Sequence, residues 1–136
     1  MLLQREMAVY ELTIERDFSA AHTMRGHPGE CARLHGHNYR VLLTVEGEQL
    51  NDGGMLMDFA ELKRILDDLL AGLDHHHLNE VPPFDEINPS SENLARYLFE
   101  CVAERLPEGV GVSAIRIFES ATSSVTYRGP AAGRGA

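Results

Sequence analysis

The stretch from His35 to Glu46 constrains the fold more than any other part of the chain. From His37 onward, apolar residues recur at every second position, a pattern typical of a β-strand with one buried face. Side chains two residues apart on a strand point to the same side, so His35 and His37 share a face. The sequence therefore predicts a half-buried strand whose inner face begins with two neighbouring imidazoles.

The other elements follow from the same kind of pattern. Residues 20–33 contain glycine and proline and are typical of a loop, and residues 74–86 are polar and irregular. Asp58 is a suitable helix N-cap before an apolar stripe that begins with Phe59 and Leu62. The predicted elements are strands 9–18 and 37–46, helices after Asp58 and after residues 89–91, and strands 112–119 and 122–127.

This order of strands and helices predicts an α+β domain, an antiparallel four-stranded sheet with both helices on one face. A chain of 136 residues fits one domain, which we expect over residues 1–128, followed by a disordered Gly/Ala-rich tail at 129–136. A small open sheet leaves two exposed edges, so we also expect the protein to assemble into oligomers.

Composition limits the classes of function. The net charge of −9 argues against nucleic-acid binding, although Arg25, Arg33 and Arg40 make the surroundings of the histidine motif locally basic. No apolar run approaches the ~20 residues of a membrane span, and the first seven residues do not resemble a secretory signal. Two cysteines are too few for a disulfide scaffold. A cytoplasmic protein that does not bind membranes is expected.

The seven histidines form two clusters, and the first has the spacing of a metal site. A catalytic zinc ion typically has three protein ligands and one open position. His35 and His37 supply two ligands from one strand. His22 ends the preceding strand and can approach them if the two strands pair antiparallel. His27 is the alternative third ligand, but it lies in the Gly/Pro loop.

Cys31 lies in the same polar loop, close to Arg33 and to the predicted metal site. Both neighbours would favour the thiolate and make Cys31 a candidate base or nucleophile. Two alternatives stay open: a fourth zinc ligand, which would close the site, and a small buried side chain. Cys101 lies on the apolar stripe of the second helix and is interpreted as part of the core.

Carboxylates outside the first histidine cluster complete the candidate chemistry. Asp74 directly precedes three histidines at 75–77, and an Asp–His pair can orient an imidazole for proton transfer. Glu119 continues the apolar face of its strand, where it is either an exposed strand end or an acceptor for a planar N–C–N edge such as that of a pterin or guanine.

Six motifs carry a family resemblance over most of the chain, from about residue 18 to residue 129. They are Phe18-x-Ala20-Ala21-His22, Cys31-x-x-x-His35-Gly36-His37-Asn38-Tyr39, Met57-Asp58-Phe59, Leu73-Asp74-His75-x-x-Leu78-Asn79, Pro89-x-Ser91-Glu92-Asn93 and Glu119-Ser120. With them the chain resembles the 6-pyruvoyl-tetrahydropterin synthase superfamily, and most closely its bacterial 6-carboxy-5,6,7,8-tetrahydropterin synthase branch of queuosine biosynthesis. The second and fourth motifs, in this order, are highly specific.

The resemblance implies the tunnelling fold, whose ββααββ subunits form trimeric barrels that stack into homohexamers with active sites between subunits. It implies a zinc-dependent lyase that acts on 7,8-dihydroneopterin triphosphate. The implied site residues are His22, His35 and His37 for Zn²⁺, Cys31 as general base, Asp74 with His75 as a second proton-transfer pair, Glu119 as pterin anchor, and Ser91, Arg25 and Arg33 as further substrate contacts.

The resemblance leaves the product open. The queuosine branch adds water and releases 6-carboxytetrahydropterin, acetaldehyde and triphosphate, whereas elimination of triphosphate by the same residues gives 6-pyruvoyltetrahydropterin. A third alternative is a zinc- and pterin-binding oligomer without catalysis. The motifs assign no role to His27, His76 or His77.

Overall fold

The computed structural model describes residues 9–131, apart from the side chains of Glu30 and Cys31. Its long elements are β1 (Tyr10–His22), β2 (His35–Gly47), α2 (Phe59–Ala71), α3 (Ser91–Ala103), β3 (Gly111–Ser120) and β4 (Ser123–Tyr127). Two short 3-10 turns, η1 (Gly29–Ala32) and η2 (Leu78–Glu80), lie in the connections. The predicted order of strands and helices is confirmed.

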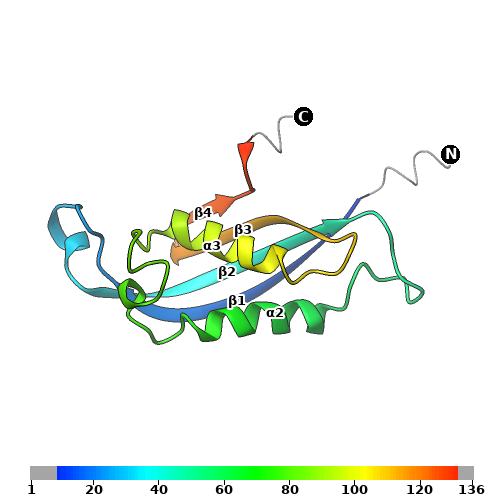
Figure 1. The fold of residues 1–136 in the computed structure, drawn as a ribbon, viewed down its shortest axis with the longest axis horizontal. Helices are drawn as coiled ribbons and strands as arrows, with labels where there is room; N and C mark the ends of the chain where they lie inside the picture. Colours follow the sequence, from blue (N-terminus) through cyan, green and yellow to red (C-terminus); the bar gives the residue numbers. More distant parts are fainter. Residues whose placement is uncertain (1–8, 132–136) are drawn as a thin grey trace.

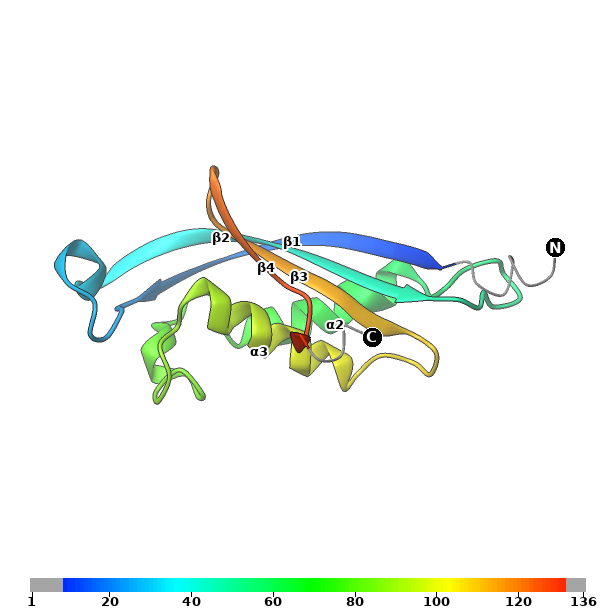
Figure 2. The same ribbon diagram turned by 90° about the horizontal axis from the view of Figure 1, so that it is seen from above.

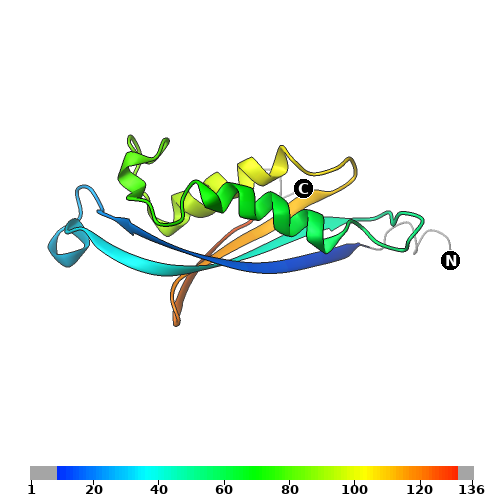
Figure 3. The same ribbon diagram turned by 90° about the horizontal axis from the view of Figure 1, so that it is seen from below.

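The four strands form one antiparallel sheet in the order β1-β2-β3-β4 (Figure 1). Both helices cover the same face of this sheet, as Figures 2 and 3 show from opposite sides. The predicted α+β architecture is therefore confirmed. None of the helices within residues 9–131 is long and apolar enough to cross a membrane.

The β1–β2 hairpin is longer than predicted. β1 continues past Phe18 to His22, and β2 begins at His35 instead of His37. Ala20 and His22 keep the inward alternation of the strand and are 7% and 1% exposed. The backbone therefore stays paired over residues 20–22, where the glycines and proline further along predicted a loop. The extended register places His22 opposite His35 and Ala20 opposite His37.

Both helices are capped by the side chain that precedes them. The Asp58 carboxylate accepts from Ala60 N, and Ser90 Oγ accepts from Asn93 N. In α2 the buried face is centred on Leu62 and Leu66. Phe59, predicted on this face, is 53% exposed at the first residue of the helix.

The core lies between the inner face of the sheet and the two helices. Tyr39, Val41 and Leu43 of β2 are fully buried there, together with Ile115 and Ile117 of β3. Each such side chain stabilises the fold by roughly 1.5–3 kcal/mol relative to exposure. The core therefore fixes the two central strands whose ends carry the candidate site.

The chain after α2 runs beside the end of β1 and extends the sheet there. His75 N donates to Ser19 O, Ala21 N donates to His76 O, and His77 forms a parallel bridge with Ala21. This pairing covers one end of an edge strand. Of the predicted tail, residues 132–136 lie outside the described residues.

Candidate metal centre and adjoining pocket

Three imidazoles and one carboxylate meet at the end of the β1–β2 hairpin. One ligand atom each from His22, His35, His37 and Glu119 lies within 4.8 Å of the others. His22 Nε2 is 3.1 Å from His35 Nε2, and Glu119 Oε1 is 2.9 Å from His37 Nε2. The structure thus brings together the three predicted metal ligands and leaves His27 in the exposed loop, where Nδ1 contacts Pro28 O at 2.9 Å.

The tautomers of two histidines follow from their neighbours. His22 Nδ1 is 3.0 Å from Pro89 O, and His35 Nδ1 is 2.7 Å from Arg33 O. A carbonyl oxygen only accepts, so each Nδ1 carries the proton and donates it. In the neutral rings the two Nε2 atoms then carry lone pairs and face each other at 3.1 Å. A cation between them would satisfy both.

These atoms fit a zinc ion. Tetrahedral zinc about 2.0–2.1 Å from imidazole nitrogen separates two such nitrogens by about 3.3 Å, close to the distance between His22 and His35. Among the described residues, His37 Nε2 is buried without a hydrogen-bond partner. Glu119 Oε1 lies near it but without the alignment that a hydrogen bond requires. The unpaired Nε2 of His37 and the set of three imidazoles and one carboxylate therefore fit a metal ion.

His22 is the most enclosed member of the site. Burial lowers its pKa, which favours the neutral ring that a metal requires. Tyr39 Oη lies 3.1 Å from His22 Nδ1, and its ring stacks on Phe18 at 4.7 Å. Burial also raises the pKa of Tyr39, so it stays a neutral phenol. The alternation of the strand places Tyr39 on the face of His37, but nothing in the sequence marks its contact with His22.

Glu119 reaches the site from β3. It follows the buried Ile115 and Ile117 at every second position of the strand and so lies on the same inner face. Glu119 Oε2 accepts from Ser91 Oγ at 2.9 Å, and Ser91, in the first turn of α3, is 4% exposed. Glu119 itself is about one-third exposed, which leaves its carboxylate accessible from outside.

Asp74 and His75 form a second group on the outer side of β1. Asp74 Oδ2 is 3.0 Å from His75 Nδ1, and Asp74 Oδ1 accepts from Ser19 N at 2.8 Å. The Ser19 N–H, and secondarily His75, lower the pKa of the Asp74 carboxyl. His75 has φ of +59°, a conformation uncommon for a residue with a side chain and often found at functional positions.

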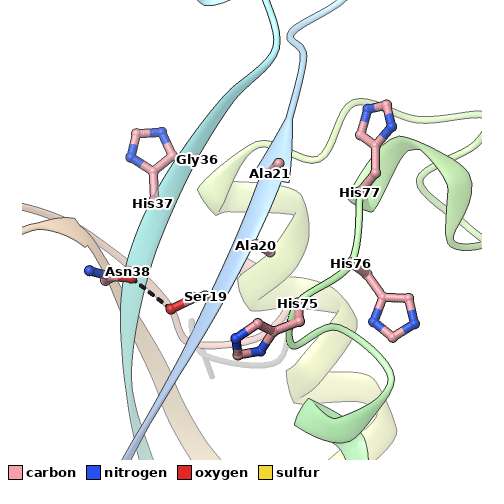
Figure 4. A pocket seen from close by; sticks show the side chains of 9 residues that line it. All are labelled: Ser19, Ala20, Ala21, Gly36, His37, Asn38, His75, His76 and His77. Atoms are coloured by element: carbon pink, nitrogen blue, oxygen red, sulfur yellow. Dashed lines mark hydrogen bonds between the residues drawn. The ribbon is translucent and has the colours of Figure 1, made fainter.

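A pocket of about 470 Å³ borders both groups (Figure 4). Its lining includes Ser19, Ala21, His37, Asn38 and the histidines at 75–77. The three neighbouring imidazoles point in different directions in Figure 4, and only that of His75 projects toward β1. His77 Nδ1 instead contacts Glu80 Oε2 at 3.1 Å.

The remaining predicted residues lie in the loop between β1 and β2. Cys31 belongs to η1, but its side chain is outside the described part of the structure. Arg33 is exposed beside the start of β2. The Arg25 guanidinium donates to backbone carbonyls of Ile87 and Phe84 at 3.1 and 2.7 Å.

Several known proteins are similar to this chain over most of its length. The family model described as 6-pyruvoyl tetrahydropterin synthase matches residues 11–130. A Synechocystis 6-carboxy-5,6,7,8-tetrahydropterin synthase is 37% identical over 122 residues, which are 85% of this chain and 91% of that protein. A Pyrococcus furiosus dihydroneopterin monophosphate aldolase is 34% identical over 102 residues, 75% of this chain and 82% of that protein.

A solved structure extends the likeness to the fold. The Caenorhabditis elegans 6-pyruvoyl tetrahydropterin synthase superposes with a TM-score of 0.79 and 28% sequence identity. The match covers 92% of this chain and 99% of that chain. The sheet and the helix pair of this chain therefore have a fold similar to that of the C. elegans protein.

Proposed function

The chain belongs to the 6-pyruvoyl tetrahydropterin synthase family, and from that premise we propose that it catalyses the 6-carboxy-5,6,7,8-tetrahydropterin synthase reaction. In this reaction, 7,8-dihydroneopterin triphosphate and water give 6-carboxy-5,6,7,8-tetrahydropterin, acetaldehyde and triphosphate, a step toward queuosine. The name and the high coverage of the Synechocystis relative support this choice.

The observation that carries the proposal is the set of three imidazoles at the hairpin end. His22, His35 and His37 would hold Zn²⁺, and two of them have their Nδ1–H fixed on backbone carbonyls. When bound, zinc supplies Lewis-acid polarisation of substrate oxygen, which eases loss of a proton from the adjacent carbon. Three protein ligands leave a position for those oxygens.

Glu119 and Ser91 are proposed to orient the pterin. A carboxylate accepts two parallel hydrogen bonds from a planar N–C–N edge, and the pterin ring presents such an edge. Ser91 Oγ donates to Oε2, which holds the carboxylate in place. Glu119 Oε1 also lies 2.9 and 3.8 Å from the Nε2 atoms of His37 and His22, so the ring would be anchored next to the metal ligands.

Two groups are proposed to move protons. Asp74 accepts the Ser19 N–H and holds the His75 imidazole at the pocket, where His75 would exchange a proton with the substrate. The role of Cys31 as general base rests on the Cys31-x-x-x-His35 spacing. We also assign the exposed Arg33 to the triphosphate, since it lies two residues before a metal ligand.

Trimeric barrels stacked into hexamers are proposed for the assembly. β1 and β4 are the two edges of the described sheet, and joining edges of neighbouring subunits would close it into a ring. Size-exclusion chromatography with light scattering should give about six times the chain mass of 15.1 kDa. A monomer at micromolar concentration would contradict this part of the proposal.

Elimination of triphosphate to 6-pyruvoyltetrahydropterin is the second candidate, favoured by the name of the superposed C. elegans protein. Product analysis of the purified, zinc-loaded protein with 7,8-dihydroneopterin triphosphate separates the two. We expect acetaldehyde and 6-carboxytetrahydropterin in equal amounts. The pyruvoyl product alone would show that the second reaction is correct. Absence of any turnover would favour the third alternative, a zinc- and pterin-binding protein without catalysis.

A further inference from the structure

The chain that follows metal ligand His22 is held by two side-chain amides. Asn79 Oδ1 accepts from Thr23 N at 2.9 Å, and Asn79 Nδ2 donates to Thr23 O at 3.0 Å. Asn88 binds Arg25 in the same way, accepting from its N and donating to its O, both at 2.9 Å. Each amide thus satisfies both backbone groups of one residue, as a neighbouring strand would.

The Arg25 side chain adds two hydrogen bonds to the backbone of the same part of the chain that Asn88 belongs to. Nη1 donates to Ile87 O at 3.1 Å, and Nη2 donates to Phe84 O at 2.7 Å. Both carbonyls belong to the connection between η2 and α3. Phe84 is fully buried and packs edge-to-face against Tyr97 at 5.3 Å, so Arg25 binds a part of that connection anchored in the core.

The same connection orients His22. Pro89, the residue after Asn88, accepts from His22 Nδ1 at 3.0 Å, and Asn88 O accepts from Asn93 Nδ2 of α3 at 2.9 Å. The Pro89 carbonyl is therefore fixed between the start of α3 and the Asn88–Arg25 contacts. Its hydrogen bond sets the tautomer and ring direction of His22, the most deeply buried of the three histidines.

We propose that Arg25 and Asn88 are positioning residues for the metal ligand His22. Together they hold residues 84–89 against the end of β1, so that the Pro89 carbonyl keeps the His22 Nδ1–H and presents Nε2 to the metal. This inference rests on the proposed metal site. It assigns the Arg25 guanidinium to the protein's own backbone instead of the triphosphate of the substrate.

The experiment measures zinc affinity of the metal-free protein by competition with a chromophoric chelator. We expect Arg25→Ala and Asn88→Ala each to raise the zinc dissociation constant by about 10-fold, the lower end of the range for residues that orient a metal ligand. Arg25→Lys should recover only part of the lost zinc affinity, because an ammonium group does not span two carbonyls as a guanidinium does. Arg96→Ala, an exposed arginine on α3, is the matched control and should leave zinc affinity unchanged.

A second pair of variants separates positioning from general loss of structure. The His22→Ala variant keeps His35 and His37 and should bind zinc more weakly. If Arg25 acts only through His22, adding Arg25→Ala to this variant should change zinc affinity by less than about 2-fold, because only independent effects of two substitutions add. A full 10-fold loss in that background would overturn the proposal. So would unchanged zinc affinity in Arg25→Ala with a raised KM for the pterin triphosphate, which would make Arg25 a substrate contact.

The proposed reaction is tested separately by its products. If Arg25→Ala weakens zinc as expected while the wild-type protein releases no acetaldehyde, the positioning role stands and the proposed reaction fails. If the wild type releases acetaldehyde and Arg25→Ala binds zinc normally, the reaction stands and the positioning role fails.

Discussion

Replacing Glu119 by glutamine tests whether this carboxylate anchors the pterin or belongs to the metal site. In the structure Oε2 accepts from Ser91 Oγ, and Oε1 lies 2.9 Å from His37 Nε2 without a hydrogen bond between them. Glutamine has nearly the same shape but replaces one acceptor oxygen by a donor NH₂. An N–H of the pterin edge would then face another donor, while the three imidazoles would remain.

The expected size of the effect follows from that single lost contact. A hydrogen bond to a charged group contributes about 1.5–3 kcal/mol, and each 1.4 kcal/mol is a factor of ten. Glu119→Gln should therefore lower kcat/KM for the pterin triphosphate by about 10- to 150-fold. Because about one-third of the side chain is exposed, the free energy of unfolding should change by no more than about 0.5 kcal/mol.

Steady-state kinetics and zinc competition on the same preparation give the decisive comparison. If Glu119 anchors the substrate, the zinc dissociation constant of Glu119→Gln stays within about 3-fold of the wild type, since three imidazoles suffice for a catalytic site. Ser91→Ala, which removes only the donor to Oε2, should have a smaller effect of about 2- to 10-fold on kcat/KM. A large loss of zinc affinity in Glu119→Gln would refute the reasoning and make Glu119 a fourth ligand.

Three further outcomes are expected. Zinc added to the metal-free protein at about 100 times its dissociation constant should raise the free energy of unfolding by about 2.7 kcal/mol in urea titrations, and no change would contradict the metal site. The lowered pKa of Asp74 means that its contribution to stability is present above its unfolded pKa of about 3.9 and is lost as pH falls through the folded pKa. Asp74→Asn should thus have a lower urea midpoint than the wild type near pH 6, with the gap closing toward pH 3, and a gap independent of pH would count against this account. Cys31→Ala should lower turnover by about 10²- to 10⁴-fold while Cys101→Ala retains it, and equal activity of the two variants would exclude Cys31 as the base.

The regular elements could be predicted because their periodicities are clear. Alternation over residues 37–46 determined both the strand and its buried face, and antiparallel pairing brought His22 within reach of His35. The predicted limits of the hairpin were wrong because the glycines and proline at residues 26–29 mark only the middle of the loop, whereas the residues on either side of it stay paired in the sheet.

The surroundings of the candidate metal ligands could not be predicted in the same way. Pro89 acts through its backbone carbonyl, which every residue possesses, so no residue type marks the contact with His22. The bonds from Arg25 to Phe84 and Ile87 join positions about sixty residues apart, and they likewise end on carbonyls. When a side chain binds a backbone carbonyl, only the residue that supplies the side chain can be recognised in the sequence.

The register of the hairpin has a consequence for how this site can change in evolution. His22 and His35 face each other as the last pair of the β1–β2 ladder, and everything between them is loop. Insertions, deletions or substitutions in the part of that loop after Arg25 leave the ladder, and with it the spacing of the two histidines, in place. The stretch that carries Cys31 and Arg33 can therefore diverge in sequence while the two histidines at the end of the ladder keep their spacing.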